Sequence, residues 1–337
     1  MKGISVIICC YNSGGKLIPT LLHLAKQQSM TGIPYELIII DNNCTDNTIE
    51  IVTTNWKTQE EIFPLTIVQQ PKPGLSYARE KGIETARYDY IVLCDDDNWL
   101  CDDYLLKVFQ LMEAKPETAL VGGIGEVVAD IPIPGWFKAL NGFGYAVGDE
   151  GRKTGYVDSL YGAGMGIRKP VFDQLKNGGF TFILPDRMGK NLSSGGDIEL
   201  CLLVKKAGYK IYFDSSLLFK HFLSSDRLQW PYYLQLRKSF GKATAYLHLY
   251  DAVNSGNQLI SKRNRARQFF LFIKYSFINF RYSLFPSLFQ NVACANFVQQ
   301  RSMQLTCLLE NKKITAAARH MAIQVKQKQS LQYVNPV

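Results

Sequence analysis

Short apolar runs that alternate with helical patterns dominate the first hundred residues. The runs cover residues 4–9, 36–40, 65–68 and 90–94. Between them apolar residues return every three or four positions, as in Leu17, Leu21 and Leu24, which predicts amphipathic helices. Strands that alternate with helices are typical of a parallel sheet built from βα units. The sequence therefore predicts an α/β fold around a mostly parallel central sheet.

The pattern beyond residue 100 is more mixed. Residues 119–123, 160–167 and 209–213 are predicted strands, and residues 197–207 are a predicted helix. Ser76 is expected to cap a helix that reaches to about residue 86. From Asp226 onward the chain is predicted to be mainly helical.

Charge divides the chain more sharply than hydrophobicity does. From Asp226 onward there are 16 basic and 3 acidic residues, which give a net charge of +13. The first 225 residues contain 22 basic and 26 acidic residues, which give a net charge of −4. This asymmetry predicts an acidic catalytic part and a basic C-terminal region that meets an anionic partner.

Composition excludes several classes of protein. With 47% hydrophobic residues and 20% charged residues, the 337-residue chain is neither disordered nor fibrous. No run approaches the roughly 18 apolar residues of a membrane span, and the first apolar run is too short for a signal peptide. The eight cysteines form no C-x-x-C pair, so we expect reduced thiols and a cytoplasmic chain.

Polar residues gather where three of the predicted strands end. Tyr11 and Asn12 follow the first strand, Asp41 follows the second, and residues 95–97 follow the fourth. In a parallel sheet the carboxyl ends of the strands share one edge, and ligands bind in the crevice there. We therefore expect these three groups to form one site.

Asp95, Asp96 and Asp97 repel one another unless positive charge compensates them. Mg²⁺ or Mn²⁺, held by one or two carboxylates and by substrate phosphates, would supply that charge. The alternative is a solvated acidic turn, or the N-cap of a helix that begins at Trp99.

Other candidates each have a structural alternative. Asp41 could accept a base N–H or cap the next helix, and Tyr11 could stack on a base or pack at an edge. Arg79 could face a diphosphate or form a surface ion pair. Asp197 could deprotonate an acceptor hydroxyl or serve as a favourable charge at a helix N-terminus. His221 could be a metal ligand or a packing residue.

The order of these segments resembles glycosyltransferase family 2. The segments that carry the resemblance are residues 5–12, 39–48, 74–79, 93–97 and 194–200. The resemblance implies the GT-A nucleotide-sugar-binding fold and inversion at the anomeric carbon. It covers residues 1–225, with a nucleotide-binding half at about 1–100 and an acceptor-binding half at about 101–225, and leaves residues 226–337 as a basic helical extension.

The resemblance also implies roles for single residues. The nucleotide would be bound by Tyr11, Asn12, Asp41, Arg79, Asp95 and Asp96. A Mn²⁺ or Mg²⁺ ion would be held by Asp97 and His221, and Asp197 would be the catalytic base. The loops around the acceptor and the donor sugar would include Trp99, Gly164, Met165, Gly196 and Glu199. Gly196 departs from the family, which usually has Glu there.

Together these features predict a metal-dependent, inverting glycosyltransferase. Its donor would be a nucleotide-sugar, with UDP favoured, and its acceptor a hydroxyl of a glycan or a lipid-linked molecule. The Gln-x-x-Arg-Trp motif of processive synthases is missing, so transfer of one sugar per encounter is expected. The alternatives are a non-catalytic nucleotide-sugar-binding module and a sugar-nucleotide pyrophosphorylase, whose glycine-rich N-terminal motif the chain lacks.

The C-terminal region contains a basic stripe in an aromatic background. Arg267, Lys274 and Arg281 are seven residues apart and would lie along one helix face. Phenylalanines cover much of the remaining surface, so the helix would lie on an anionic membrane or pack on a protein surface. Nucleic-acid binding fits less well, because no recognised module accompanies the charge. We predict weak peripheral attachment at the cytoplasmic face, with the oligomeric state left open.

Overall fold

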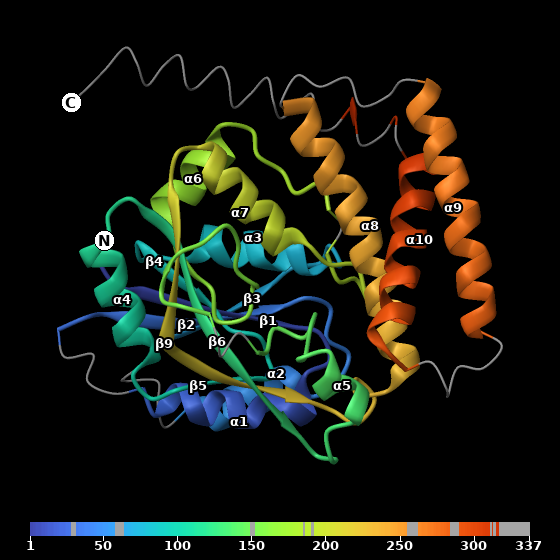
Figure 1. Ribbon diagram of the computed structural model, residues 1–337. Helices are drawn as coiled ribbons and strands as arrows, with labels where there is room; N and C mark the ends of the chain where they lie inside the picture. The colour runs from blue at the N-terminus through green and yellow to red at the C-terminus, as the bar shows by residue number, and fades with distance from the viewer. Residues whose placement is uncertain are drawn as a thin grey trace, which may run out of the picture.

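The computed structural model describes residues 1–27, 32–57, 64–148, 152–184, 186–189, 192–254, 262–283, 290–310, 312 and 315–316. The end of the predicted C-terminal extension, residues 317–337, lies outside this part. A nine-stranded sheet runs through the described residues, with helices on both faces and the C-terminal helices beside it (Figure 1).

The predicted parallel βα units are confirmed in the first half of the sheet. The strands lie in the order β3-β2-β1-β4, and all neighbours are parallel. Their bounds are Ile4–Cys10 for β1, Tyr35–Asp41 for β2, Leu65–Gln69 for β3 and Tyr90–Leu93 for β4. The helices that follow the first three strands are α1 (Gly14–Ala25), α2 (Thr48–Trp56) and α3 (Leu75–Thr85).

Strand β1 shows why this half needs helices on both faces. Its side chains alternate between the faces, and nearly all of them are apolar and buried. Ile4, Val6 and Ile8 pack in the cluster that includes residues of α1 and α2, whereas Ile7 packs in the cluster that includes α3. Two apolar layers therefore hold the sheet between its helices.

The second half of the sheet continues in the order β8-β6-β9-β5. Strand β8 is antiparallel to β4 and β6, β6 and β9 are parallel, and β5 and β7 are antiparallel to β9. The strands are β5 (Asn98–Leu100), β6 (Thr118–Ala129), β7 (Gly155–Tyr156), β8 (Gly166–Arg168) and β9 (Lys210–Leu223). The helices here are α4 (Tyr104–Ala114), α5 (Gly135–Ala139), α6 (Lys169–Asn177) and α7 (Gly196–Lys206).

Three local predictions were wrong. Only the end of the predicted strand 160–167 is a strand, because Gly164 adopts a left-handed φ of 68° that breaks extended structure before β8. Gly74, not Ser76, precedes α3, and the buried Ser76 hydroxyl has no hydrogen-bond partner among the described residues. No helix begins at Trp99, which lies in β5 against β9.

The basic C-terminal region is helical, as predicted. It consists of α8 (Trp230–Asn254), α9 (Lys262–Ser283) and α10 (Val292–Leu309). Trp230, Tyr233 and Leu236 of α8 pack with Trp136 and Tyr145 in one buried cluster. Among the described residues, no helix combines the length and the apolar composition needed to cross a bilayer.

Candidate active site

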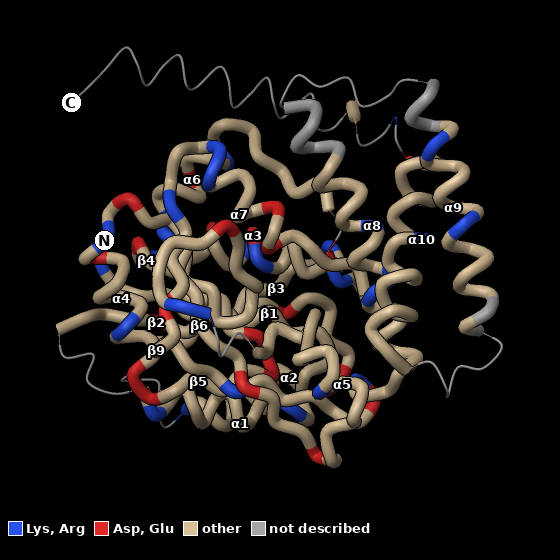
Figure 2. The backbone as a smooth tube through the Cα atoms, viewed as in Figure 1, with Lys and Arg blue, Asp and Glu red and all other residues tan. Residues whose placement is uncertain are grey.

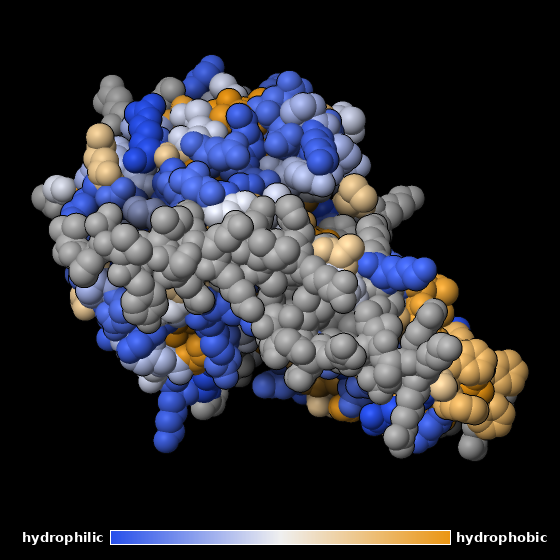
Figure 3. Space-filling view, turned by 90° about the horizontal axis from the view of Figure 1, so that it is seen from above, coloured by the Kyte–Doolittle hydropathy of each residue, from blue (hydrophilic) through white to orange (hydrophobic). Residues whose placement is uncertain are grey.

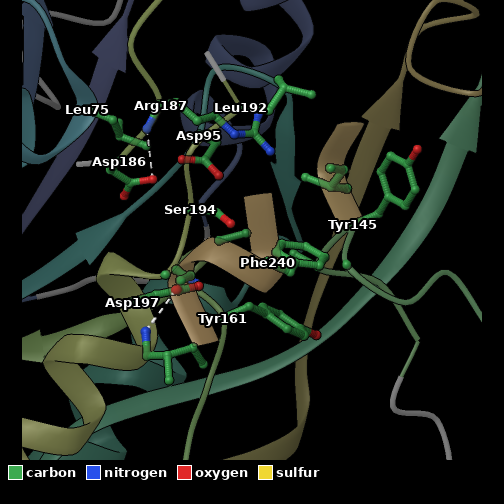
Figure 4. Close-up of a pocket in the computed structure, with 18 of the residues that line it drawn as sticks. Leu75, Asp95, Tyr145, Tyr161, Asp186, Arg187, Leu192, Ser194, Asp197 and Phe240 are labelled. Atoms are coloured by element: carbon green, nitrogen blue, oxygen red, sulfur yellow. Dashed lines mark hydrogen bonds between the residues drawn. The ribbon is translucent and has the colours of Figure 1, made fainter. Parts of the chain in front are cut away.

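The three groups of polar residues do meet at one edge of the sheet. Cys10 pairs with Asp41 across β1 and β2, and Ile7 pairs with Leu93 across β1 and β4, so the ends of these strands are neighbours. A cavity of about 1000 Å³ opens beside them, and Tyr11 and the Asp95–Asp97 segment line it. Figure 4 shows part of this cavity.

The three consecutive aspartates are neither a solvated turn nor a helix cap. Each pairs with a basic residue from a different element. The pairs are Asp95 Oδ1 with Arg79 Nη2 at 3.4 Å, Asp96 Oδ1 with Lys16 Nζ at 2.8 Å and Asp97 Oδ2 with Arg227 Nη1 at 2.6 Å. The repulsion expected from the sequence is therefore balanced by charges of the chain itself.

The neighbouring carboxyl groups of Asp96 and Asp97 have opposite pKa shifts. Burial raises the pKa of Asp96, with Asp97 adding to the effect and Lys16 opposing it. Burial acts on Asp97 in the same direction, but His221 and Arg227 outweigh it and hold the pKa of Asp97 well below its usual range. Asp97 is thus a firmly ionised carboxylate in the cavity wall.

Asp97 and His221 have the donor atoms of a partial metal site. His221 lies on β9, and its Nε2 atom is 3.4 Å from Asp97 Oδ1, while its Nδ1 atom has no partner among the described residues. No group of three or more His, Cys, Asp or Glu side chains in the described part is arranged to hold a metal ion. Phosphate oxygens would have to complete such a site, as they do around Mg²⁺ in phosphate-binding enzymes.

Arg79 is mostly enclosed by the protein, with 12% of its side chain exposed. Its guanidinium group bridges Asp95 and Asp186, with Nη1 at 3.3 Å from Asp186 Oδ2. Gly162 leaves room for it, since a Cβ atom there would lie 3.1 Å from Nη2. The surface-ion-pair alternative for Arg79 is therefore wrong, and Asp186 is a site residue outside the predicted set.

Asp197 lies in the first turn of α7 and lines the same cavity (Figure 4). Its Oδ2 atom accepts the Gly162 N–H at 3.0 Å, and its Oδ1 atom accepts the Ile198 N–H at 2.8 Å. Burial and the nearby Asp186 carboxylate raise its pKa, while Arg79 opposes them. A carboxylate with a raised pKa is better suited to remove a proton.

Glu199 and Gly196 support the loop before α7. Buried Glu199 accepts the backbone N–H groups of Ile183 and Leu184 at 3.0 and 3.1 Å, and burial raises its pKa to about 7. At Gly196 a Cβ atom would lie 3.0 Å from Asp186 Oδ2. The Asp186 carboxylate therefore lies against the position at which the family usually has Glu.

Asp41 and Asn12 shape loops next to the cavity. Asp41 Oδ1 accepts the Cys44 N–H at 2.9 Å, and Asn12 Oδ1 accepts the Thr45 N–H at 2.7 Å. Asn42, which follows Asp41, lines the cavity and accepts the Gly74 N–H at 2.9 Å. Tyr11 is half exposed at the cavity edge, where its ring is accessible for stacking.

Three predicted loop residues pack elsewhere. Trp99 stacks between His23 and Phe222, with ring centroids 5.8 and 5.9 Å apart. The carbonyl of Gly164 accepts the Tyr104 hydroxyl at 2.7 Å, and Met165 is fully buried in the core. From this segment, Gly162 and Ala163 line the cavity instead.

The far end of the cavity is apolar and includes the C-terminal region. Leu236, Phe240 and Leu247 of α8 line it together with Leu140 and Phe143. Figure 4 shows Phe240 and Tyr145 across the cavity from Asp95 and Asp186. At Gly195, beside Asp197, a Cβ atom would lie 3.0 Å from Ala243 Cβ of α8. The helix therefore also packs against the turn that carries Asp197.

Lys16, Asp186 and Arg227 are site residues that were not predicted. The sequence contained one weak indication of a role for Lys16. This lysine lies in the first turn of α1, where a positive charge is unfavourable next to the helix dipole. Asp186 and Arg227 were given no role of their own, since their partners Arg79 and Asp97 are 107 and 130 residues away and no local pattern indicates such pairs.

Comparisons with known proteins indicate the family of this chain. The family model described as "Glycosyl transferase family 2" matches residues 5–175. Glycosyltransferase GlyG of Streptococcus pneumoniae is 28% identical over 119 residues, which are 35% of this chain and 38% of that protein. Poly-beta-1,6-N-acetyl-D-glucosamine synthase of Staphylococcus epidermidis is 28% identical over 36% of this chain and 28% of that protein. These matches span less than two fifths of either relative.

One solved structure shares the fold over nearly the whole chain. It is TarS 1–349 of S. aureus in complex with UDP-GlcNAc, with a TM-score of 0.50 and 15% sequence identity. The match covers 96% of this chain and 89% of that one.

Proposed function

This chain belongs to glycosyl transferase family 2, and from that premise we propose that it transfers a sugar from a nucleotide-sugar to an acceptor hydroxyl with inversion. One observation carries the proposal. A single cavity joins the polar residues that follow three parallel strands, Tyr11 and Asp95–Asp97 among them, to the carboxylate of Asp197. Donor and acceptor can therefore meet between them.

The polar end of the cavity would bind the donor. Tyr11 would stack on the base, with Asn12 and Asp41 holding the loops around it. Asp95 and Asp96 would contact the nucleotide together with Arg79 and Lys16, the basic residues with which they form ion pairs. Basic side chains in a partly buried cleft favour a diphosphate, because guanidinium and ammonium groups donate several hydrogen bonds to phosphate oxygens.

We propose that Asp97 and His221 hold Mn²⁺ or Mg²⁺ when the donor is bound. Their close approach supports this, since a carboxylate and an imidazole 3.4 Å apart offer two ligands on one side of the cavity. The cation would neutralise the charge that develops on the departing diphosphate.

Asp197 would act as the general base in a single displacement. It removes the proton of the acceptor hydroxyl as that oxygen forms a bond to the anomeric carbon. The bond from this carbon to the diphosphate oxygen breaks, and its electron pair leaves with the diphosphate. The Gly162 N–H holds the Asp197 carboxylate in place. The raised pKa of Asp197 supports its assignment as the base.

The apolar end of the cavity favours a lipid-linked acceptor over a free glycan. Leu236 and Phe240 would contact the hydrocarbon part, while the sugar hydroxyl reaches Asp197. A UDP-sugar is the preferred donor, and transfer of one sugar per encounter remains our prediction.

We also propose that α9 rests on an anionic membrane surface. Phe269, Phe270, Ile273, Phe277 and Phe280 are exposed and lie on one face of the helix at the spacing of successive turns. Figure 3 shows hydrophobic side chains gathered at the edge where α9 lies, and Figure 2 marks its basic residues. Exposed Arg267 and Lys274 flank this face, as expected for contact with lipid headgroups.

The first experiment identifies the donor. UDP-, GDP- and dTDP-sugars are tested with Mn²⁺ for an increase in melting temperature, beginning with UDP-GlcNAc because TarS was crystallised with it. We expect one nucleotide class to stabilise the protein, and no stabilisation by any donor would contradict the proposal.

The second experiment tests the base. Asp197→Asn should reduce transfer by about 10²–10⁴-fold, because the amide cannot accept the acceptor proton. Donor-induced stabilisation should persist, since Asn can still accept the Gly162 N–H. The matched control is Asp173→Asn on the surface of α6, which should leave transfer unchanged. Near-full activity of Asp197→Asn would refute the assignment, and donor binding without transfer by the native chain would indicate a binding module.

A further inference from the structure

Arg227 forms the shortest of the three ion pairs described above for Asp95, Asp96 and Asp97, a segment that we call the acidic corner of the cavity. Its Nη1 atom lies 2.6 Å from Asp97 Oδ2, and only 14% of the Arg227 side chain and 7% of the Asp97 side chain are exposed. Lys16 Nζ lies 4.0 Å from the same oxygen, so Asp97 is already surrounded by positive charge of the chain.

The backbone holds Arg227 where it can reach the cavity. It lies in the turn between β9 and α8, where its N–H donates to Ser224 O at 2.9 Å and its carbonyl accepts the Tyr145 hydroxyl at 2.7 Å. The guanidinium group lines the cavity, and its buried Nε–H has no partner among the described residues. Arg227 therefore has a guanidinium donor that its ion pair with Asp97 does not use.

A diphosphate that enters this corner changes the balance of charge. It brings at least two negative charges next to buried Asp96 and Asp97, which is costly at low dielectric unless positive charge turns toward it. Guanidinium pairs with phosphate oxygens through two parallel hydrogen bonds, so Arg227 is chemically suited to that partner. A divalent cation on Asp97 would also repel Arg227 from its present position.

We propose that Arg227 is a donor-binding residue that leaves its ion pair with Asp97 to bind the diphosphate of the donor. Until the nucleotide binds, this ion pair prevents a divalent cation from binding to Asp97. This inference rests on the proposed function. Because breaking the Arg227–Asp97 pair costs less when both groups gain new partners together, the nucleotide and the metal ion bind cooperatively. The C-terminal region thereby supplies a ligand of the donor.

The test measures Mn²⁺ binding to the full chain by electron paramagnetic resonance, with and without UDP or whichever of GDP and dTDP the donor panel selects. For the native chain we expect weak Mn²⁺ binding that the nucleotide tightens by about 5–150-fold, the usual range of coupling between two sites. Arg227→Gln should bind Mn²⁺ alone more tightly than the native chain. It should bind the nucleotide about tenfold or more weakly, and the coupling should shrink.

Arg187→Gln is the matched control. Arg187 lines the same cavity but forms no ion pair with the described residues Asp95, Asp96 and Asp97. Its replacement therefore removes a positive charge from the cavity without breaking an ion pair of Asp97. It should leave Mn²⁺ binding without nucleotide unchanged. Arg227→Lys keeps the charge but loses the paired hydrogen bonds. If melting curves show that the glutamine variant does not fold, the lysine variant tests the diphosphate contact: it should bind the nucleotide more weakly than the native chain, and native-like nucleotide binding would overturn the inference.

The outcomes separate this inference from the proposed function. Unchanged or weaker binding of Mn²⁺ alone to a folded Arg227→Gln chain overturns the exchange, whatever the nucleotide does. Native-like coupling in that variant does the same. If no nucleotide binds to any variant, the proposed function fails, while tighter binding of Mn²⁺ alone to Arg227→Gln still shows that Arg227 closes Asp97.

Discussion

At the scale of single residues, carboxylates within one cavity are tuned in different directions. Asp97 is held ionised by Arg227 and His221, whereas the pKa values of Asp96 and Asp197 are raised, chiefly by burial. Groups whose surroundings shift their pKa values apart can serve as a charge-binding group and as a base in one reaction.

Asp186→Asn tests this tuning through pH dependence. Asp186 raises the pKa of Asp197, and its loss also frees Arg79, which lowers that pKa. Both effects have the same sign, so Asp197 should ionise at lower pH in the variant. We expect the acidic limb of the pH profile of kcat/KM to move to lower pH, and Asp173→Asn should leave it in place. A shift to higher pH, or no shift, would show that Asp186 does not act on Asp197.

At the scale of elements, the pairing of β6 with β9 is irregular at a point that contacts a residue of the cavity wall. The register of these parallel strands shifts between Gly122 and Ile124. Tyr161, which lines the cavity, donates its hydroxyl to the Gly123 carbonyl at 2.7 Å and accepts the Gly125 N–H at 2.9 Å. The irregular pairing therefore also anchors a cavity side chain.

Gly123→Ala should disrupt this irregular pairing. A Cβ atom at Gly123 would lie 1.9 Å from the Leu217 carbonyl oxygen, which belongs to the backbone of β9 and cannot move freely. We expect the free energy of unfolding to fall by about 1–3 kcal/mol or more in chemical denaturation. Gly15→Ala in α1 is the control, because open space surrounds it and alanine favours helix by about 0.5–1 kcal/mol. Equal stability of the two variants would contradict the close approach of β6 and β9.

At the scale of the whole molecule, the C-terminal helices take part in the cavity and extend beyond it. Helix α8 contributes Leu236 and Phe240 to the cavity wall and Trp230 to a buried cluster. Deleting residues 226–337 would therefore expose core surface as well as remove α9. Point substitutions on the exposed face of α9 give a cleaner test of membrane binding.

The double substitution Phe270→Ser and Phe277→Ser provides that test. These side chains are 70% and 67% exposed, so their loss should leave the melting temperature unchanged. Burial of each in a lipid interface would contribute about 1.5–3 kcal/mol, so binding to vesicles of equal parts phosphatidylglycerol and phosphatidylcholine should weaken about 100-fold or more. Leu22→Ser on α1 removes a similarly exposed apolar side chain and should not change co-sedimentation. Native-like binding of the double variant would exclude α9 as the contact.

Local patterns in the sequence determined the strands, the helices between them and the edge where Tyr11, Asp41 and Asp95–Asp97 emerge. They could do so because the periods of strands and helices are properties of neighbouring residues, and because parallel strands end at a common edge. The prediction that Asp97 and Asp197 share one cavity followed from this order together with the family resemblance, and both residues do line it.

The tertiary structure alone decided which charges meet. Arg79 pairs with Asp186 and Asp97 with Arg227 across more than a hundred residues, and no local period records such a pairing. It also decided that Gly164 and Met165 turn into the core and that α8 closes the apolar end of the cavity. Ion pairs and packing depend on distances in space, which a single sequence specifies only through the complete fold.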